Sequence, residues 1–166
     1  MSKFEHIRHK PPQLLIEPRP LVIVCAPLRS SVNLSRMLRL AGNCGVTRLI
    51  HCGAGKIDRD IARDAADYVA LETHRSLPPM LDKLRGAGLR LVGLEQTTNS
   101  QCLYDYKFAK QTALIIGAER EGLSAEALER LDDVVEIPVY GQPASHNVVT
   151  ATTMALYEYC RQFPSG

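Results

Sequence analysis

Short apolar runs recur along the chain and predict strands that are buried on both faces. A strand with one face in water would alternate apolar and polar residues, and most of these runs do not alternate. The first run directly follows Pro20. The predicted strands cover residues 21–26, 47–51, 68–71, 89–94, 112–116 and 134–137.

Segments with the apolar period of a helix lie between these strands. In residues 30–43 the apolar positions recur at helical spacing behind Ser30, which can cap the first turn. Further helices are predicted over residues 58–66, 76–85, 124–131 and 145–162, and residues 95–110 form a polar connection. Strands that alternate with helices predict an α/β fold, in which helices cover both faces of a parallel sheet.

The length of 166 residues suits one domain with its own hydrophobic core. Residues 1–20 are basic and proline-rich and are predicted to form an N-terminal tail, ahead of a domain over residues 21–166. The sequence has no apolar run long enough to span a membrane, and the tail lacks the apolar stretch of a secretory signal. We therefore expect a cytoplasmic protein with no membrane partner.

The net charge of +2 is too small to indicate a nucleic-acid partner by itself. Basic residues gather in the tail, at Lys3, Arg8 and Lys10, and in the first predicted helix, at Arg36 and Arg39. Both groups could contact phosphates, or they could simply face solvent. Charge alone leaves the two interpretations open.

The five cysteines are odd in number and have no CxxC spacing. This pattern argues against a disulfide framework and against a zinc site. We expect small buried thiols, and the positions of histidine and cysteine suggest no metal.

The common glycine signatures of nucleotide sites are missing. The segment that follows the first strand, residues 26–31, contains no glycine, which argues against a Rossmann loop, and no Walker A pattern is present. Gly53 and Gly55 follow the second strand without a third glycine, and this segment is predicted to be a plain turn.

Glycines and polar residues instead gather after the late strands. They form clusters over residues 93–95, 117–122 and 137–141, and the last cluster leads into residues 145–147. The carboxyl ends of parallel strands lie on one edge of a sheet, and glycine lets the backbone approach a ligand closely. Together the clusters suggest a ligand site, although each cluster by itself is typical of an ordinary turn.

Three blocks of sequence, in order, resemble the SpoU (TrmH-type) branch of the SPOUT methyltransferases. They are NLSRMLRLAGNCG at residues 33–45, LIIGAEREGLS at residues 114–124, and IPV followed by SHNVVTA at residues 137–139 and 145–151. The resemblance implies a deep trefoil knot near the C-terminus, in which the last helix passes through a loop formed around residues 95–122. It also implies S-adenosyl-L-methionine as the cofactor and a homodimer packed through the first and last helices.

The resemblance also assigns residues to an active site and to a cofactor pocket. The active-site residues it implies are Asn33, Arg39, Glu119, Ser145 and Asn147. The cofactor-binding residues it implies are Leu94, Glu95, Ile116, Gly117, Glu119, Ile137, Val139 and Asn147. His146 departs from the pattern, because the family usually carries an apolar residue at this position.

The implied reaction transfers a methyl group from S-adenosylmethionine to a ribose 2′-hydroxyl in structured RNA, with transfer RNA favoured over ribosomal RNA. The 2′-oxygen restricts the acceptor to RNA. Arg39 would act as the base, or it would bind phosphate and stabilise the alkoxide, because a guanidinium resists deprotonation. Two alternatives stay open. One is a catalytically inactive, knotted RNA-binding or assembly protein, and the other is a SPOUT enzyme that methylates a base nitrogen.

Overall fold

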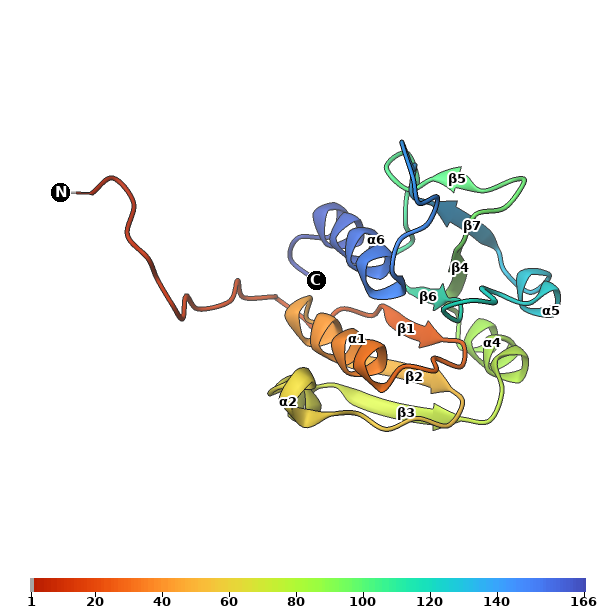
Figure 1. Ribbon diagram of the computed structural model, residues 1–166, viewed down its shortest axis with the longest axis horizontal. Helices are drawn as coiled ribbons and strands as arrows, with labels where there is room; N and C mark the ends of the chain where they lie inside the picture. The colour runs from red at the N-terminus through yellow and green to blue at the C-terminus, as the bar shows by residue number, and fades with distance from the viewer. Residues whose placement is uncertain (1) are drawn as a thin grey trace.

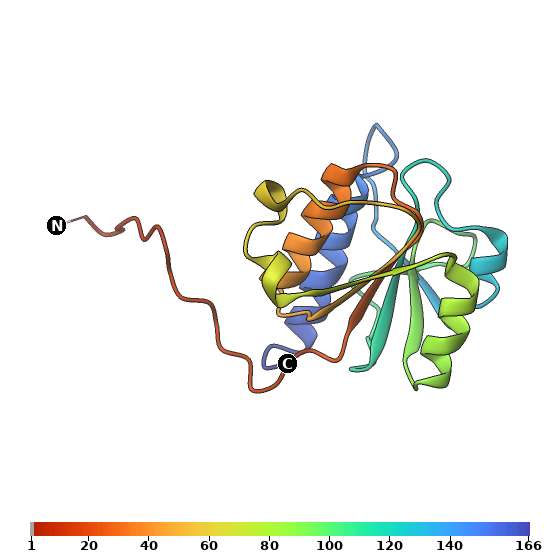
Figure 2. The same ribbon diagram turned by 90° about the horizontal axis from the view of Figure 1, so that it is seen from below.

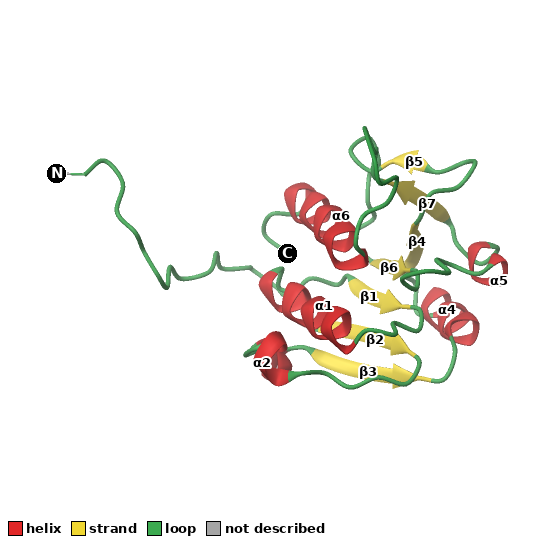
Figure 3. Ribbon diagram, in the orientation of Figure 1, coloured by secondary structure: helices red, strands yellow, loops and turns green. Residues whose placement is uncertain are grey.

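A computed structural model describes residues 2–166 and contains one parallel sheet. The sheet has seven strands in the order β3-β2-β1-β6-β4-β7-β5 (Figure 3). The strands are β1 (Val22–Cys25), β2 (Arg48–Cys52), β3 (Ala70–His74), β4 (Arg90–Leu94), β5 (Gln101–Cys102), β6 (Thr112–Ile116) and β7 (Asp133–Glu136). The α/β architecture with a parallel sheet, predicted from the sequence, is confirmed.

Helices cover both faces of the sheet (Figures 1 and 2). Helices α1 (Ser31–Asn43) and α6 (Val148–Gln162) lie side by side on one face, and the short helices α2 (Arg59–Ala62) and α3 (Ala65–Tyr68) pack beside α1. Helices α4 (Leu77–Gly86) and α5 (Ala125–Leu128) lie on the opposite face.

Two apolar layers form the core, one on each side of the sheet. In β1, Ile23 faces the layer that holds α1 and α6, and Val24 faces the layer that holds α4. Both residues are fully buried. Burial on both faces explains why this strand is apolar at every position, as expected for a parallel sheet.

The segment between β2 and β3 differs from its prediction. One helix was predicted over residues 58–66, but Arg63 has a φ of 57° and separates α2 from α3. This left-handed backbone interrupts the helix, a change that apolar spacing does not reveal. The prediction of a strand over residues 68–71 is also wrong in its bounds, because Tyr68 ends α3 and β3 starts at Ala70.

The largest differences in the second half of the chain are an additional short strand and the bounds of two helices. The predicted polar connection contains β5, whose two residues pair with β7 and are too few to show a pattern. Helix α5 ends at Leu128 rather than at residue 131. Helix α6 begins at Val148 rather than at residue 145, because Asn147 caps it.

The N-terminal segment extends away from the body and joins it shortly before β1 (Figure 1). The backbone N–H of Ile16 donates to the carbonyl of Ser165 at 2.9 Å. The buried guanidinium of Arg19 donates to the carbonyl of Cys44 at 2.7 Å and to that of Phe163. Arg19 therefore ties the ends of α1 and α6 together. None of the helices in residues 2–166 is long and apolar enough to cross a membrane.

Candidate active site

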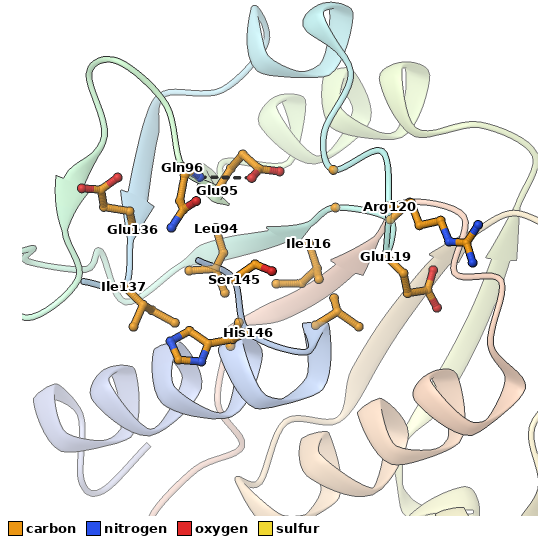
Figure 4. A pocket seen from close by; sticks show the side chains of 15 residues that line it. Leu94, Glu95, Gln96, Ile116, Glu119, Arg120, Glu136, Ile137, Ser145 and His146 are labelled. Atoms are coloured by element: carbon orange, nitrogen blue, oxygen red, sulfur yellow. Dashed lines mark hydrogen bonds between the residues drawn. The ribbon is translucent and has the colours of Figure 1, made fainter. Parts of the chain in front are cut away.

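A cavity of about 280 Å³ opens at the carboxyl ends of β4, β6 and β7, beside the start of α6 (Figure 4). This volume is near the lower end of the range for small-molecule sites, about 300 Å³ and above. The lining residues are Leu94, Glu95, Gln96, Ile116, Gly117, Ala118, Glu119, Arg120, Gly122, Glu136, Ile137, Ser145, His146, Val148 and Ala151. The late clusters of glycine and polar residues thus meet at one edge, as the sequence predicts.

Two glycines close the tight loop that follows β6. Ala118 and Gly122 bridge each other through backbone hydrogen bonds of 3.0 and 3.2 Å. A Cβ atom on Gly117 would lie 2.7 Å from the carbonyl carbon of Gly122. Gly122 has a φ of 65°, and a Cβ atom there would lie 2.5 Å from the carboxylate of Glu95. Gly117 is therefore needed for close approach within its own loop, and that loop presents Glu119 to the cavity.

Glu95 links the end of β4 to the same loop. Its carboxylate accepts hydrogen bonds from the backbone N–H of Leu123 and from that of Gln96, both at 3.1 Å. The apolar side chains of Leu94, Ile116 and Ile137 come from β4, β6 and the residue after β7 and lie along the cavity in Figure 4. The cavity thus combines an apolar wall with a fixed carboxylate.

Glu119 reaches from the cavity to the start of α1. Its carboxylate accepts from the backbone N–H of Arg29 at 3.0 Å, from that of Ser30 at 3.1 Å and from the amide of Asn33 at 3.2 Å. Burial raises the pKa of Glu119, but these hydrogen bonds outweigh burial and hold the pKa below its usual range. Glu119 is therefore an anion that positions the first turn of α1.

Asn147 joins this network from the start of α6. Its amide donates to Asn33 Oδ1 at 3.4 Å, and its own Oδ1 accepts from the backbone N–H of Val149 at 2.8 Å and of Thr150 at 3.4 Å. Asn147 therefore caps α6 and contacts a candidate active-site residue at the same time. The network of Glu119, Asn33 and Asn147 brings together residues that are far apart in the sequence.

Ser145 lines the cavity but lies in the loop before α6, so its predicted place at the start of that helix is wrong. The helix starts later because Asn147 supplies the cap. His146, whose role the sequence left open, also lines the cavity (Figure 4). Val139 and Asn147, both predicted in the cofactor pocket, are not part of the cavity lining.

Arg39 is a predicted active-site residue that lies apart from both the cavity and the network of Glu119, Asn33 and Asn147. It lies on the exposed side of α1. Six residues along a helix correspond to a rotation of about 240°, so Arg39 and Asn33 point in different directions. Between residues 2 and 166, Arg39 makes no hydrogen bond or ion pair with a cavity residue.

Ala118, Arg120 and Gly122 line the cavity and belong to the predicted cluster of residues 117–122, although no role was assigned to them individually. Sequence reasoning missed four lining residues, which are Gln96, Glu136, Val148 and Ala151. Most of them are direct neighbours of predicted residues at the same strand ends, and Ala151 lies one helical turn beyond Asn147. A rule that includes the neighbours of each strand end would have found them.

The fold and the cavity define an α/β protein with room for a small-molecule ligand at the carboxyl edge of a parallel sheet. The model of the SpoU rRNA Methylase family matches residues 20–157, and the chain belongs to this family. It is thus a methyltransferase whose cofactor is S-adenosylmethionine.

Known relatives agree with this family. The chain is 28% identical over 154 residues to the tRNA (guanosine(18)-2′-O)-methyltransferase of Escherichia coli (strain K12), covering 90% of this chain and 67% of that protein. It matches the structure of the A. aeolicus TrmH/SpoU tRNA modifying enzyme with a TM-score of 0.82 and 27% identity, over 88% of this chain and 76% of that one. It matches the SpoU methyltransferase AviRb of Streptomyces viridochromogenes, solved with AdoMet, with a TM-score of 0.76 and 28% identity, over 91% and 63% of the two chains.

The cavity suits this cofactor in its chemistry. Glu95, Glu119 and Glu136 line it, whereas Arg120 is the lining arginine. S-adenosylmethionine carries a cationic sulfonium and an ammonium group, which carboxylates attract, and its adenosine can pack on the apolar wall. Within the part of the chain that the structure describes, no group of three or more acidic, histidine or cysteine side chains is placed to hold a metal ion.

Proposed function

We propose that this chain transfers a methyl group from S-adenosylmethionine to a ribose 2′-hydroxyl in RNA, and that transfer RNA is favoured over ribosomal RNA. The observation that carries the proposal is the network of Glu119, Asn33 and Asn147 at the edge of the carboxylate-lined cavity. The preference for transfer RNA rests on the relatives that act on it. A cytoplasmic location would follow from these substrates.

The cofactor, when bound, supplies an electrophilic methyl group. Leu94, Ile116 and Ile137 would hold its apolar part and keep water out of the cavity. Ser145, in the loop before α6, also lines the cavity, and its hydroxyl would orient the ribose. Such positioning supplies a large share of the rate of a displacement that needs its reacting atoms in line.

The proton of the 2′-hydroxyl needs an acceptor, and Glu119 is poorly suited because its hydrogen bonds lower its pKa. We assign the role to Arg39, either as a base or as a cation that stabilises the alkoxide. Since Arg39 lies away from the cavity of its own chain, this role requires a second copy to bring it there.

A homodimer through α1 and α6 would supply this second copy. The two helices lie side by side and expose Val32 on α1 and Tyr157 on α6. Arg39 lies on the same exposed side of α1 as Val32, two helical turns away.

We also propose that the chain is knotted, with α6 passing through the loop of residues 95–122. The segment between β7 and α6 lies against residues near both ends of that loop. Gln96 donates to the carbonyl of Ala144 at 3.3 Å, and Ser145 and His146 share the cavity with Gly117. These contacts on both sides of the segment support the knot.

The proposed function is tested with the purified protein, labelled S-adenosylmethionine and separate pools of transfer RNA and ribosomal RNA. We expect label in transfer RNA, and mass spectrometry of nuclease digests should place the methyl group on a ribose. A methyl group on a base would identify a SPOUT enzyme that methylates base nitrogens. Binding of RNA and cofactor without transfer would identify an inactive RNA-binding protein.

A further inference from the structure

His51 is a buried histidine at the carboxyl edge of the sheet, and it lies outside the cavity. It is the next-to-last residue of β2 and pairs in register with Cys25 of β1. Its side chain is buried, with 1% of the residue exposed, and its Nε2 accepts a hydrogen bond from the backbone N–H of Leu28 at 3.0 Å. A backbone N–H only donates, so Nε2 carries no proton and the neutral imidazole carries it on Nδ1.

The hydrogen bond of His51 is the first of a series. Leu28, Arg29 and Ser30 are consecutive residues in the loop between β1 and α1. The N–H of Leu28 is held by His51, and the N–H groups of Arg29 and Ser30 are held by Glu119. Two side chains from different strand ends therefore fix three successive N–H groups of this loop.

This loop sets the position of Asn33. The hydroxyl of Ser30 accepts from the backbone N–H of Asn33 at 3.1 Å and caps α1. Asn33 then donates to Glu119 and accepts from Asn147. A shift of the loop at Leu28 would move the N-terminal end of α1 relative to the cavity, and with it the whole network.

The turn after β2 closes over the imidazole. A Cβ atom on Gly55 would lie 3.0 Å from Cε1 of His51 and 3.1 Å from Cδ2 of Leu34, so a side chain there would crowd the ring. Nδ1 of His51 faces the backbone of Gly53 in the same turn, while Nε2 accepts the well-formed hydrogen bond from the N–H of Leu28. The ring is thus enclosed with its acceptor nitrogen fixed on the loop between β1 and α1.

We propose that His51 is a positioning residue for methyl transfer: its Nε2 anchors the Leu28 amide and thereby holds Glu119 and Asn33 in their working arrangement. This role rests on the proposed function, because the arrangement that it maintains is that of the proposed active site. His51 touches neither substrate nor cofactor. Its effect passes through the backbone of residues 28–30.

Two substitutions by side chains of similar size separate the effect of the hydrogen-bond acceptor from the effect of packing. His51→Gln keeps an acceptor at the end of the side chain, and His51→Met keeps the length without a good one. We expect His51→Met to lower kcat roughly tenfold, because one hydrogen bond is lost, while KM for RNA and Kd for S-adenosylhomocysteine change less than about threefold. We expect His51→Gln to retain kcat to within about threefold of the original.

His74 provides the matched control. It is a histidine at the end of the neighbouring strand β3, where it faces Glu72 at 3.4 Å and is not part of the network. His74→Met should leave kcat unchanged. Equal kcat values for the Met and Gln variants of His51, or a fall in kcat that His74→Met reproduces, would overturn the proposal.

If a variant does not fold, amide hydrogen exchange measured on the unsubstituted protein tests whether the amide of Leu28 is held. The amides of Leu28, Arg29 and Ser30 should be protected together, and rapid exchange at Leu28 would overturn the proposal. This readout needs no activity. If the unsubstituted protein transferred no methyl group while Leu28 stayed protected, the proposed function would fail and the anchoring of the loop would stand.

Discussion

Glu119 connects two functions at the scale of single residues, since its carboxylate both lines the cavity and holds the backbone at the start of α1. Three donors converge on it, from Arg29, Ser30 and Asn33. Hydrogen bonds to an ionised carboxylate are among the stronger ones in proteins. The residue therefore contributes to stability as well as to the site.

Glu119→Gln should destabilise the fold by about 1–3 kcal/mol, because an amide nitrogen would face backbone donors. Urea denaturation measures this change. Glu121→Gln is the matched control, since Glu121 is exposed and pairs with Arg29 at the surface. An equal effect of the two substitutions would show that the network around Glu119 contributes no more to stability than the exposed ion pair of Glu121.

The stability that Glu119 contributes should depend on pH. The pKa of Glu119 in the folded chain lies below the ordinary value of 4.5, so the ionised form of Glu119 stabilises the fold above that value. That contribution is lost as the pH falls through the folded pKa. The stability difference between the original protein and Glu119→Gln should therefore shrink from pH 7 toward acid, and a constant difference would contradict the assignment.

Arg39→Ala should abolish methyl transfer, while calorimetry should show that S-adenosylhomocysteine binds as before. Arg36→Ala is the control, because Arg36 is an exposed arginine one turn earlier on the same helix. Normal turnover by the Arg39 variant would remove this residue from the mechanism.

The sequence predicted which residues lie together at the carboxyl edge better than it predicted how they are arranged there. Glu95, Ile116, Gly117 and Ile137 line the cavity as predicted, because strand ends of one sheet must meet at one edge. His51 was not predicted, since a histidine in a buried strand shows no pattern in sequence. Its partner is a backbone N–H, which every residue except proline carries.

At the scale of elements, the pattern of apolar residues predicts a strand or helix well where burial determines its composition. The pattern fails where a single residue sets the end of an element. Strands β1, β4 and β6 lie within a residue or two of their predicted bounds because burial on both faces determines their composition. The break at Arg63 and the start of α6 at Val148 depend on one backbone angle and one side-chain cap. Such local features leave no periodic signal.

Asn147 allows capping and function to be separated at the start of α6. Asn147→Ala should lower stability by about 1 kcal/mol, because the cap of Val149 and Thr150 is lost. Asn147→Asp should keep the cap but lose the donor to Asn33. We expect normal thermal stability with reduced methyl transfer for Asp, and full activity of the Asp variant would leave Asn147 with capping alone.

At the scale of the whole molecule, the body and the N-terminal segment differ in how they are held. The body has a core on both faces of the sheet, whereas residues 2–14 extend away from it and are exposed. A basic extended segment can contact phosphates without fixed packing. The division between tail and domain at residue 20 stays a prediction, and Arg19 packs on the body.

Deletion of residues 2–14 should weaken RNA binding and leave the affinity for S-adenosylhomocysteine unchanged, because the basic tail lies away from the cavity. A variant with Lys3, Arg8 and Lys10 changed to Gln should lose the same RNA affinity. Filter binding at several salt concentrations measures the RNA affinity of the deletion and of this variant. The apolar control changes Phe4 and Ile7, both exposed, to Ser. Unchanged RNA affinity after the deletion would show that the segment is only a linker.

The cavity at the carboxyl edge is the proposed cofactor site, and calorimetric titration of the folded protein with S-adenosylhomocysteine tests it most directly. We expect saturable binding with one site per chain. Absence of binding heat at every temperature tested, with the fold confirmed by circular dichroism, would contradict the assignment of this cavity to the cofactor.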